Sequence, residues 1–197
     1  MEDRDEICPL RSAYVFARER LSEKRYGHTL RVADTAEVLA RTHGVHPPRA
    51  RLAALLHDAA RELSAEKFLD LVDSWDLPVG EPERESPKLL HGPVAAELAR
   101  RELGLEDGEV LDAVREHTTG RPGMGPLSLV LYVSDKVEPA RDYPSVERLR
   151  RLAREDLREA AAECLRRSIA NNEERGRPTH PASIETLGWL EEAEDGA

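Results

Sequence analysis

The residues of this chain best suited to chemistry are four histidines and two aspartates in a fixed order. Neutral imidazoles and carboxylates are the side chains that divalent transition metals bind, and six of them can hold two ions. Two such ions about 3.5–4 Å apart suit the cleavage of phosphate esters and anhydrides. The pattern therefore predicts a metal-dependent hydrolase site. Its six residues are His28, His57, Asp58, His91, His117 and Asp135.

The first three of these residues are predicted to face a helical core. Helical spacing places His28 on one face with Val32 and Leu39. The pair His57-Asp58 ends the apolar run that starts at Leu52, where a buried aspartate without a partner would cost much free energy. Two other interpretations stay open: His28 as a core histidine bonded to a carbonyl group, and Asp58 as the start of an exposed helix end.

The last three residues have open alternatives as well. His91 and His117 stand at the expected start and end of two helices, where a polar residue is common. Asp135 lies in a mostly apolar helix and could instead form a salt bridge with an arginine. Successive residues of the set are separated by about one helical hairpin, and antiparallel helices joined in this way can bring all six side chains to the middle of a bundle.

The elements that must position these residues are predicted to be helices throughout. Ala, Leu, Arg and Glu dominate the chain, which favours helix, and no stretch alternates with the period of a strand. Ser64 and Asp107 are expected N-caps and Gly104 a C-terminal stop, while 78–87, 118–125 and 138–144 are expected loops. We predict an all-α bundle of about ten helices with the metal site at its centre. The predicted helices cover about 10–21, 26–42, 47–58, 65–75, 91–103, 108–117, 126–135, 145–154, 156–171 and a short segment from Pro181.

Composition excludes several classes of protein. The chain has 197 residues, of which 40% are hydrophobic and 35% charged, so we expect one globular domain over 1–197. Its formal charge of −10 argues against a nucleic-acid polymer as partner. The arginine-rich run 148–151 is balanced by nearby acids and is predicted to be a solvated helix face. An acidic protein that acts on an anion must supply positive charge locally, and metal ions can do so.

Other features place the protein in a reducing compartment, and we expect the cytoplasm. Cys8 and Cys164 are far apart, without a CxxC pattern. The acidic N-terminus does not resemble a signal peptide, and no apolar run is long enough to span a membrane. We expect His43 and His46 to be solvated and His180 to be a cap or surface residue. The acidic segment 191–197 is expected to be an appended tail.

The motifs around the six residues resemble the HD superfamily of metal-dependent phosphohydrolases. More closely, they are similar to its YqeK-type members, the bacterial symmetrical bis(5′-nucleosyl)-tetraphosphatases, over about residues 25–177. A bare HD doublet is weak evidence, but HTTGRPGM followed by DKVEPARDYP is specific. The matching motifs are RYGHTLRV from Arg25, LAALLHD from Leu52, LLHGP from Leu89, HTTGRPGM from His117 and LYVSDKVEPARDYP from Leu131.

The resemblance implies a di-iron site that cleaves diadenosine tetraphosphate into two ADP by means of a hydroxide that bridges the metals. It implies that His28, His57, Asp58 and Asp135 hold one metal, and that His91 and His117 hold the second, with Asp58 bridging. We expect two divalent transition-metal ions, iron first, with manganese, cobalt or zinc as alternatives. One departure is Arg61, where the superfamily more often has lysine; arginine is a forked donor and lysine a point charge.

Phosphate binding is expected from groups close to the ligands in sequence. Arg61 is the first candidate and is also expected to be catalytic. Each of these cations could instead be part of a surface salt bridge. The expected substrate-binding residues are Arg25, Arg61, Thr118, Thr119, Gly120, Arg121, Lys136 and Arg141.

Two rival functions stay open at this point. One is an HD-type phosphohydrolase that acts on nucleoside mono- or triphosphates, and the other is a nucleotide-sensing or partner-binding module with little catalysis. The intact set of six ligands argues against the second. The expected partner is a dinucleoside polyphosphate or another nucleotide, without membrane or nucleic-acid polymer, and the protein is expected to be a monomer or homodimer.

Overall fold

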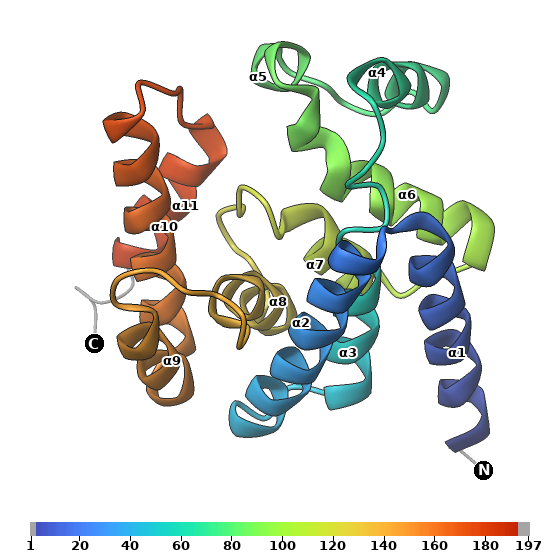
Figure 1. The fold of residues 1–197 in the computed structure, drawn as a ribbon, viewed down its shortest axis with the longest axis horizontal. Helices are drawn as coiled ribbons and strands as arrows, with labels where there is room; N and C mark the ends of the chain where they lie inside the picture. The colour runs from blue at the N-terminus through green and yellow to red at the C-terminus, as the bar shows by residue number, and fades with distance from the viewer. Residues whose placement is uncertain (1–2, 193–197) are drawn as a thin grey trace.

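The computed structural model describes residues 3–192, with side chains from residue 9 onward, and this part of the chain is built from helices without a strand (Figure 1). The prediction of an all-α fold is therefore confirmed. The first six helices are α1 (Asp3–Arg20), α2 (Glu23–Thr42), α3 (Pro47–Leu56), α4 (Ala65–Ser74), α5 (Glu81–Glu85) and the 3₁₀ helix η1 (Pro87–Leu90). The others are α6 (His91–Leu103), α7 (Gly108–Glu116), α8 (Pro126–Val137), α9 (Val146–Glu155), α10 (Leu157–Glu174) and α11 (Pro181–Glu192).

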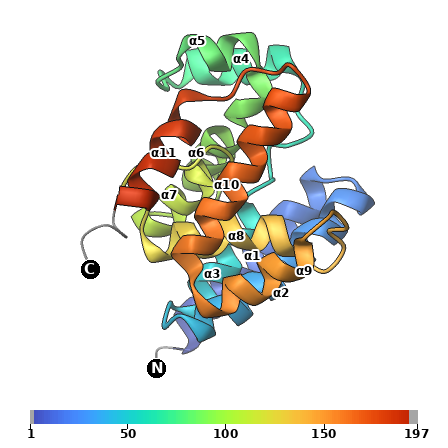
Figure 2. The same cartoon turned by 90° about the vertical axis from the view of Figure 1, so that its left-hand side faces the viewer.

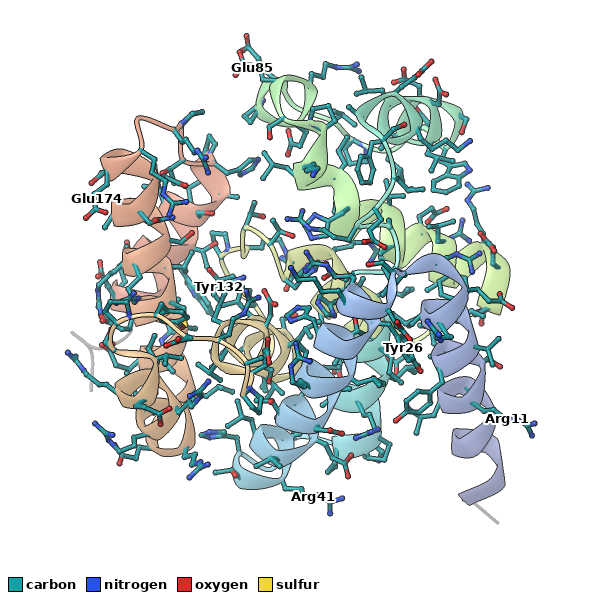
Figure 3. The ribbon with its side chains drawn as sticks, in the orientation of Figure 1. Arg11, Tyr26, Arg41, Glu85, Tyr132 and Glu174 are labelled. Carbon is teal, nitrogen blue, oxygen red and sulfur yellow. The ribbon has the colours of Figure 1, made fainter. Side chains whose placement is uncertain are left out.

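The centre of the bundle is formed by α2, α3, α7 and α8, in which α3 and α8 each contact the other three helices. Helix α8 is buried on all sides, with every side chain from Leu127 to Asp135 shielded from water. A helix that is apolar around its whole circumference belongs in the interior. Tyr132 of α8 lies deep in the molecule, beside α10 (Figure 3). Figure 1 shows α1 on one side of this centre and the pair α10 and α11 on the other.

Local signals start and stop the helices where the sequence indicates. The side chains of Ser64 and Asp107 accept backbone N–H groups at the starts of α4 and α7, as predicted. Gly104 ends α6 in the left-handed conformation, with φ of 65°. Asp107 and Gly104 thus mark the ends of α7 and α6 that lie opposite to His117 and His91.

The predicted loop over 78–87 is partly wrong, because it contains the short helix α5 and the start of η1. Pro82 fixes φ in the first turn of α5. The carboxylate of Glu83 accepts the N–H of Gly80 at 3.0 Å, which satisfies a donor that this turn leaves free. The alternating charges therefore support a helical turn between α4 and η1.

Three smaller expectations also need correction. Helix α3 ends at Leu56, before the predicted end at Asp58. His43 is half-buried, and its Nε2 lies 2.7 Å from the carbonyl oxygen of Ala153, whereas His46 is exposed as expected. Arg150 is not a solvated residue, because its guanidinium donates to the carbonyls of Val137, Glu138, Pro139 and Arg141 and so holds the loop after α8.

No helix in residues 3–192 combines the length and the apolarity of a membrane span. Most of the expected acidic tail, residues 193–197, lies outside the described residues.

Candidate metal centre and central cavity

The structure brings all six predicted ligands together from five helices. His28 lies on α2, His91 opens α6, and Asp135 lies near the end of α8. His57 and His117 are the C-cap residues of α3 and α7, and Asp58 follows His57. All six side chains are buried. Helix ends therefore meet at this point and direct their polar residues inward.

Asp58 is at the middle of the cluster. Its Oδ2 lies 3.8 Å from Nε2 of His28 and 3.4 Å from Nε2 of His57. Its Oδ1 lies 3.5 Å from Nε2 of His91 and 4.0 Å from Nε2 of His117. The cluster thus contains two groups with the spacing of metal ligands, and Asp58 belongs to both.

The backbone fixes which ring nitrogen of three histidines carries the hydrogen. Nδ1 of His57, His91 and His117 lies 2.6, 2.6 and 2.7 Å from the carbonyl oxygen of the residue three positions earlier. A carbonyl oxygen can only accept, so each Nδ1 donates its hydrogen. The lone pair on each Nε2 consequently points toward Asp58.

His28 is oriented by a carboxylate instead. Its Nδ1 lies 3.1 Å from Oε1 of Glu138, a residue that is 2% exposed. Arg31 donates to the other oxygen of Glu138 at 2.7 Å, and so does the N–H of Ala140. Burial raises the pKa of the Glu138 carboxyl, but the contacts with Arg31, the N–H of Ala140 and His28 together outweigh burial and leave the pKa below the usual value. An ionised Glu138 can only accept, so Nε2 of His28 is also left without hydrogen and lies 3.0 Å from Oδ1 of Asp135.

This arrangement fits divalent cations. Nε2 of His91 and Nε2 of His117 are 2.9 Å apart. Burial lowers the pKa of His91 to about 4, with help from Arg61, and burial together with His91 holds the pKa of His117 well below the usual value. Two neutral imidazoles therefore direct lone pairs at each other, and the buried Nε2 atoms of His28 and His57 have no hydrogen-bond partner among the described residues. A cation within reach of these lone pairs satisfies them, and the mixed nitrogen and oxygen donors suit transition metals.

The two carboxylates also favour positive charge here. Burial opposes ionisation of Asp58, but the His57 ring beside it holds the pKa of that carboxyl well below its usual range. Burial likewise raises the pKa of Asp135, but the Lys136 ammonium at 2.7 Å, His28, His57 and Arg141 together hold it well below the usual value. Burial lowers the pKa of His57, but Asp58, Asp135 and the Ala54 carbonyl together raise it above the usual value. Both aspartates are therefore anionic at neutral pH, as metal ligands must be.

Gly92 allows α6 and α7 to approach closely at the cluster. A Cβ atom at this position would lie 2.9 Å from the carbonyl oxygens of Val114 and Arg115 and 3.3 Å from Nδ1 of His117. Contacts that short between a Cβ and the backbone do not occur in folded proteins. The absence of a side chain at Gly92 therefore lets His91 and His117 meet.

A cavity of about 380 Å³, here called the central cavity, opens beside the cluster. Thr118 stands at its wall, with Oγ1 3.2 Å from Nε2 of His91. Three polar residues of the wall were not expected from the sequence: Lys88, Asn172 and Arg177. The walls consist of Asp58, Arg61, Lys88, Leu89, His91, His117, Thr118, Asp135, Lys136, Asn172 and Arg177.

The predicted phosphate-binding cations differ in what they contact. Arg25 pairs with Asp58 at 3.1 Å, and Lys136 and Arg141 pair with Asp135 at 2.7 and 2.8 Å. Arg61 stands in the wall of the central cavity, and no ion pair joins it to a carboxylate of residues 9–192; its Nη1 lies 3.3 Å from Nδ1 of His91. Among the five predicted cations, Arg61 therefore has a guanidinium beside the cluster that is not neutralised.

Three predicted residues that follow Thr118 do not line the central cavity. Arg121 donates to Glu116 at 2.7 Å and lines a different cavity with Pro126. Gly120 is buried and has a φ of 72°, and a Cβ there would lie 2.8 Å from Thr186 of α11. Gly120 thus serves the packing of α11 against this turn. Thr119 is half-buried and lines a cavity next to the central one.

His180 has the cap contact expected from the sequence. Its Nδ1 accepts the N–H of Ala182 in the first turn of α11 at 3.1 Å. Its Nε2 lies 2.9 Å from Oε1 of Glu83 in α5. The residue therefore also joins two elements that are far apart in sequence.

Comparison with known proteins identifies the family of this chain. Residues 25–186 match the model of the HD domain. The symmetrical bis(5′-nucleosyl)-tetraphosphatase of Bacillus subtilis (strain 168) is 36% identical over 178 residues, which cover 90% of this chain and 95% of that protein. The protein of the same name from Staphylococcus aureus (strain NCTC 8325 / PS 47) is 37% identical over 70% of each chain.

A solved structure has the same fold. It is the crystal structure from Clostridium acetobutylicum of an HD superfamily hydrolase described as involved in NAD metabolism. It superposes with a TM-score of 0.90 at 34% identity, and the match covers 93% of this chain and 97% of that one.

Proposed function

Because this chain belongs to the HD domain family, we propose that it is a metal-dependent hydrolase that cleaves diadenosine tetraphosphate symmetrically into two molecules of ADP. The observation that carries the proposal is the pair of ligand groups that share Asp58. The names of the relatives with 36% and 37% identity support the choice of substrate.

The ligands divide between two ions around Asp58. His28, His57, Asp58 and Asp135 would hold one ion, and Asp58, His91 and His117 the other. When bound, the ions would supply Lewis acidity, which neutralises phosphate charge and lowers the pKa of water enough for it to act as a nucleophile near neutral pH. We propose iron first, and the mixed donor set also suits manganese, cobalt or zinc.

The side chains of the protein position the substrate in this proposal. Water adds to one of the two inner phosphorus atoms, the bond from that phosphorus to the central bridging oxygen breaks, and ADP leaves. Arg61 would donate to the oxygens of the attacked phosphate, since its guanidinium lines the central cavity without a carboxylate partner. The hydroxyl of Thr118 would donate to the same group. Glu138 would hold His28 in the orientation that presents Nε2.

Product analysis tests the proposed function. The purified protein, supplied with iron(II), manganese(II), cobalt(II) or zinc(II) in turn, should convert diadenosine tetraphosphate to ADP as the sole nucleotide product. The variant Asp58→Ala should lose at least about 10³-fold in rate, because the loss of a ligand shared by both groups removes several kcal/mol of stabilisation of the transition state.

A matched control comes from α4, where Asp70 is exposed, and Asp70→Ala should keep the wild-type rate. Circular dichroism should show the same helical content for both variants. Release of AMP and ATP would contradict symmetrical cleavage, and a faster reaction with nucleoside mono- or triphosphates would favour the rival hydrolase function.

A further inference from the structure

A second cavity, of about 870 Å³, adjoins the central cavity and is here called the Arg177 cavity. It lies between α5 and η1 on one side and the turn from α10 to α11 on the other, two regions that face each other in Figures 1 and 2. Leu89, Thr118, Asn172 and Arg177 line both cavities, so the two are continuous. The contact between His180 and Glu83 joins the two sides.

The charges around the Arg177 cavity are separated along its length. Lys88 and Arg177 stand where the central cavity begins, and neither forms an ion pair with a carboxylate in residues 9–192. Glu81 and Glu85 line the Arg177 cavity from α5, and Figure 3 shows Glu85 at the outer edge of the molecule. An anion is therefore attracted to the inner end of this cavity and repelled from the outer end.

The walls of the outer part suit an uncharged heterocycle and its sugar. Pro82, Pro178 and Pro181 provide apolar surface, and Ser183 and Thr179 provide hydroxyl groups. Apolar walls with a few polar groups, and a volume of roughly 300–1,000 Å³, are typical of sites for small molecules. Such a site, with phosphates at its inner end, matches a nucleotide that enters with its nucleoside outward.

A third cavity, of about 420 Å³, also reaches the cluster and is here called the Tyr143 cavity; it borders the Arg177 cavity at Ser168. It shares Arg61, Asp135 and Lys136 with the central cavity. Its walls include Tyr143, and the guanidinium of Arg167 lies 4.7 Å from the centre of the Tyr143 ring. An aromatic ring and a cation that forms no ion pair among the described residues again suit a nucleotide.

We infer that the Arg177 cavity binds one nucleoside of a two-nucleoside substrate, with Lys88 and Arg177 on the adjoining phosphates, while the Tyr143 cavity binds the other nucleoside. The inference rests on the proposed function, because symmetrical cleavage needs equal halves of the substrate on both sides of the cluster. The inference also goes beyond that function, because it assigns Lys88, Arg177 and the walls of the Arg177 cavity to one half of the substrate alone.

A cavity-filling variant tests the nucleoside part of the inference. Ser86 is exposed and lines the Arg177 cavity, so Ser86→Trp should block this site. The KM for diadenosine tetraphosphate should rise about tenfold or more, which is the loss of about 1.4 kcal/mol of binding. The inhibition constant of adenosine 5′-tetraphosphate should change less than about twofold, because its single nucleoside can occupy the Tyr143 cavity. Ser74→Trp, on an exposed position of α4 outside these cavities, is the matched control.

A charge variant tests the phosphate part. Arg177→Ala should raise both the KM for diadenosine tetraphosphate and the inhibition constant of adenosine 5′-tetraphosphate about tenfold, because both ligands carry four phosphates. Arg175→Ala removes an exposed arginine two residues away that lines none of the three cavities, and it should leave both constants unchanged.

Equal effects of Ser86→Trp on the two ligands, or equal effects of Arg177→Ala and Arg175→Ala, would overturn the inference while the proposed function stands. Failure of the proposed function is seen separately, in the product assay of the wild-type enzyme. If that enzyme releases no ADP from diadenosine tetraphosphate, both the function and the inference fall.

Discussion

At the scale of single residues, the cluster is organised by groups that accept hydrogen bonds from Nδ1 atoms. Three backbone carbonyls and the carboxylate of Glu138 receive the four Nδ1 hydrogens, so that all four Nε2 atoms face Asp58 or Asp135. The partner of Nδ1 sets the tautomer and the ring orientation of a metal-binding histidine. The ligand geometry is therefore fixed by the protein before any metal binds.

Arg61 is the single residue that we expect to contact the phosphates most directly. Its guanidinium stands in the central cavity without a carboxylate partner. Arg61→Ala should lower kcat/KM for diadenosine tetraphosphate about 10- to 150-fold, because a hydrogen bond from a charged donor contributes roughly 1.5–3 kcal/mol. Arg61→Lys should restore most of the rate, since the superfamily pattern places lysine at this position.

Steady-state kinetics on the two Arg61 variants and on Arg11→Ala checks this prediction. Arg11 is exposed on α1, at the edge of the molecule in Figure 3, and lines neither the central cavity nor the Tyr143 cavity, so its variant should match wild type. An Arg61→Ala enzyme as fast as wild type would mean that this arginine does not contact the phosphates.

The six ligands could be predicted from the sequence because polar residues occur in or beside apolar helical stretches. Exposure to water does not explain polar residues at such positions. The sequence does not predict Glu138, Lys88 or Arg177, because their roles depend on which loops come together in space. The same limit explains Arg121, which is close to His117 in sequence but pairs with Glu116 on another side of α7.

At the scale of elements, the centre depends on the close approach of α6 and α7. Gly92→Ala should lower the free energy of unfolding by about 1–3 kcal/mol, because the added methyl group must push apart two backbones. The shift separates His91 from His117, so the metal content should fall by about one ion per chain while the other group keeps its ion.

Urea denaturation and elemental analysis of the same variant measure both effects. Gly108→Ala is the matched control, since a Cβ at Gly108 meets no atom within 4 Å at the start of α7. A Gly92→Ala protein with unchanged stability and full metal content would show that the two helices can separate without loss of the centre.

Elements with long periodic patterns are the ones that the sequence predicts best. Helix α2 has apolar residues at helical spacing, and α3 and α8 have apolar runs, so the existence of these helices follows from the pattern. The turn α5 has no apolar run and is held by Pro82 and the carboxylate of Glu83, which local pattern rules do not detect. The position of the loop after α8 likewise depends on Arg150, which reaches it from α9.

At the scale of the whole molecule, the C-terminal helices complete the site that the central helices begin. Ser183 of α11 donates to the carbonyl of Thr119 at 2.9 Å, and Thr186 packs on Gly120. The turn before α11 supplies Arg177 to the central cavity. The expectation of one domain over the whole chain stays a prediction, and the continuous core from Ala13 to Leu190 supports it.

Bound metal ions should also stabilise the fold of this protein. The six ligands come from five helices, so bound ions would connect elements that are distant in sequence. Ions that bind the folded state and not the unfolded one stabilise the fold, by about 2.7 kcal/mol per site at 100 times the Kd. For a chain of this size that gain raises Tm by roughly 5–11 °C for each site. As isolated under reducing conditions, the protein should contain close to two transition-metal ions per chain, and removal of the ions by a chelator should lower Tm by at least that amount.

The variant His57→Ala provides the control for this experiment. It should retain little metal, because it removes a ligand beside Asp58 and disturbs both groups. Its Tm should therefore respond weakly to the chelator, whereas the wild-type Tm should recover when iron(II), manganese(II) or zinc(II) is added back. Calorimetry with parallel elemental analysis measures both quantities. A wild-type protein that loses two ions without a change in Tm would show that the helices hold the six ligands together unaided, and that the centre contributes to chemistry alone.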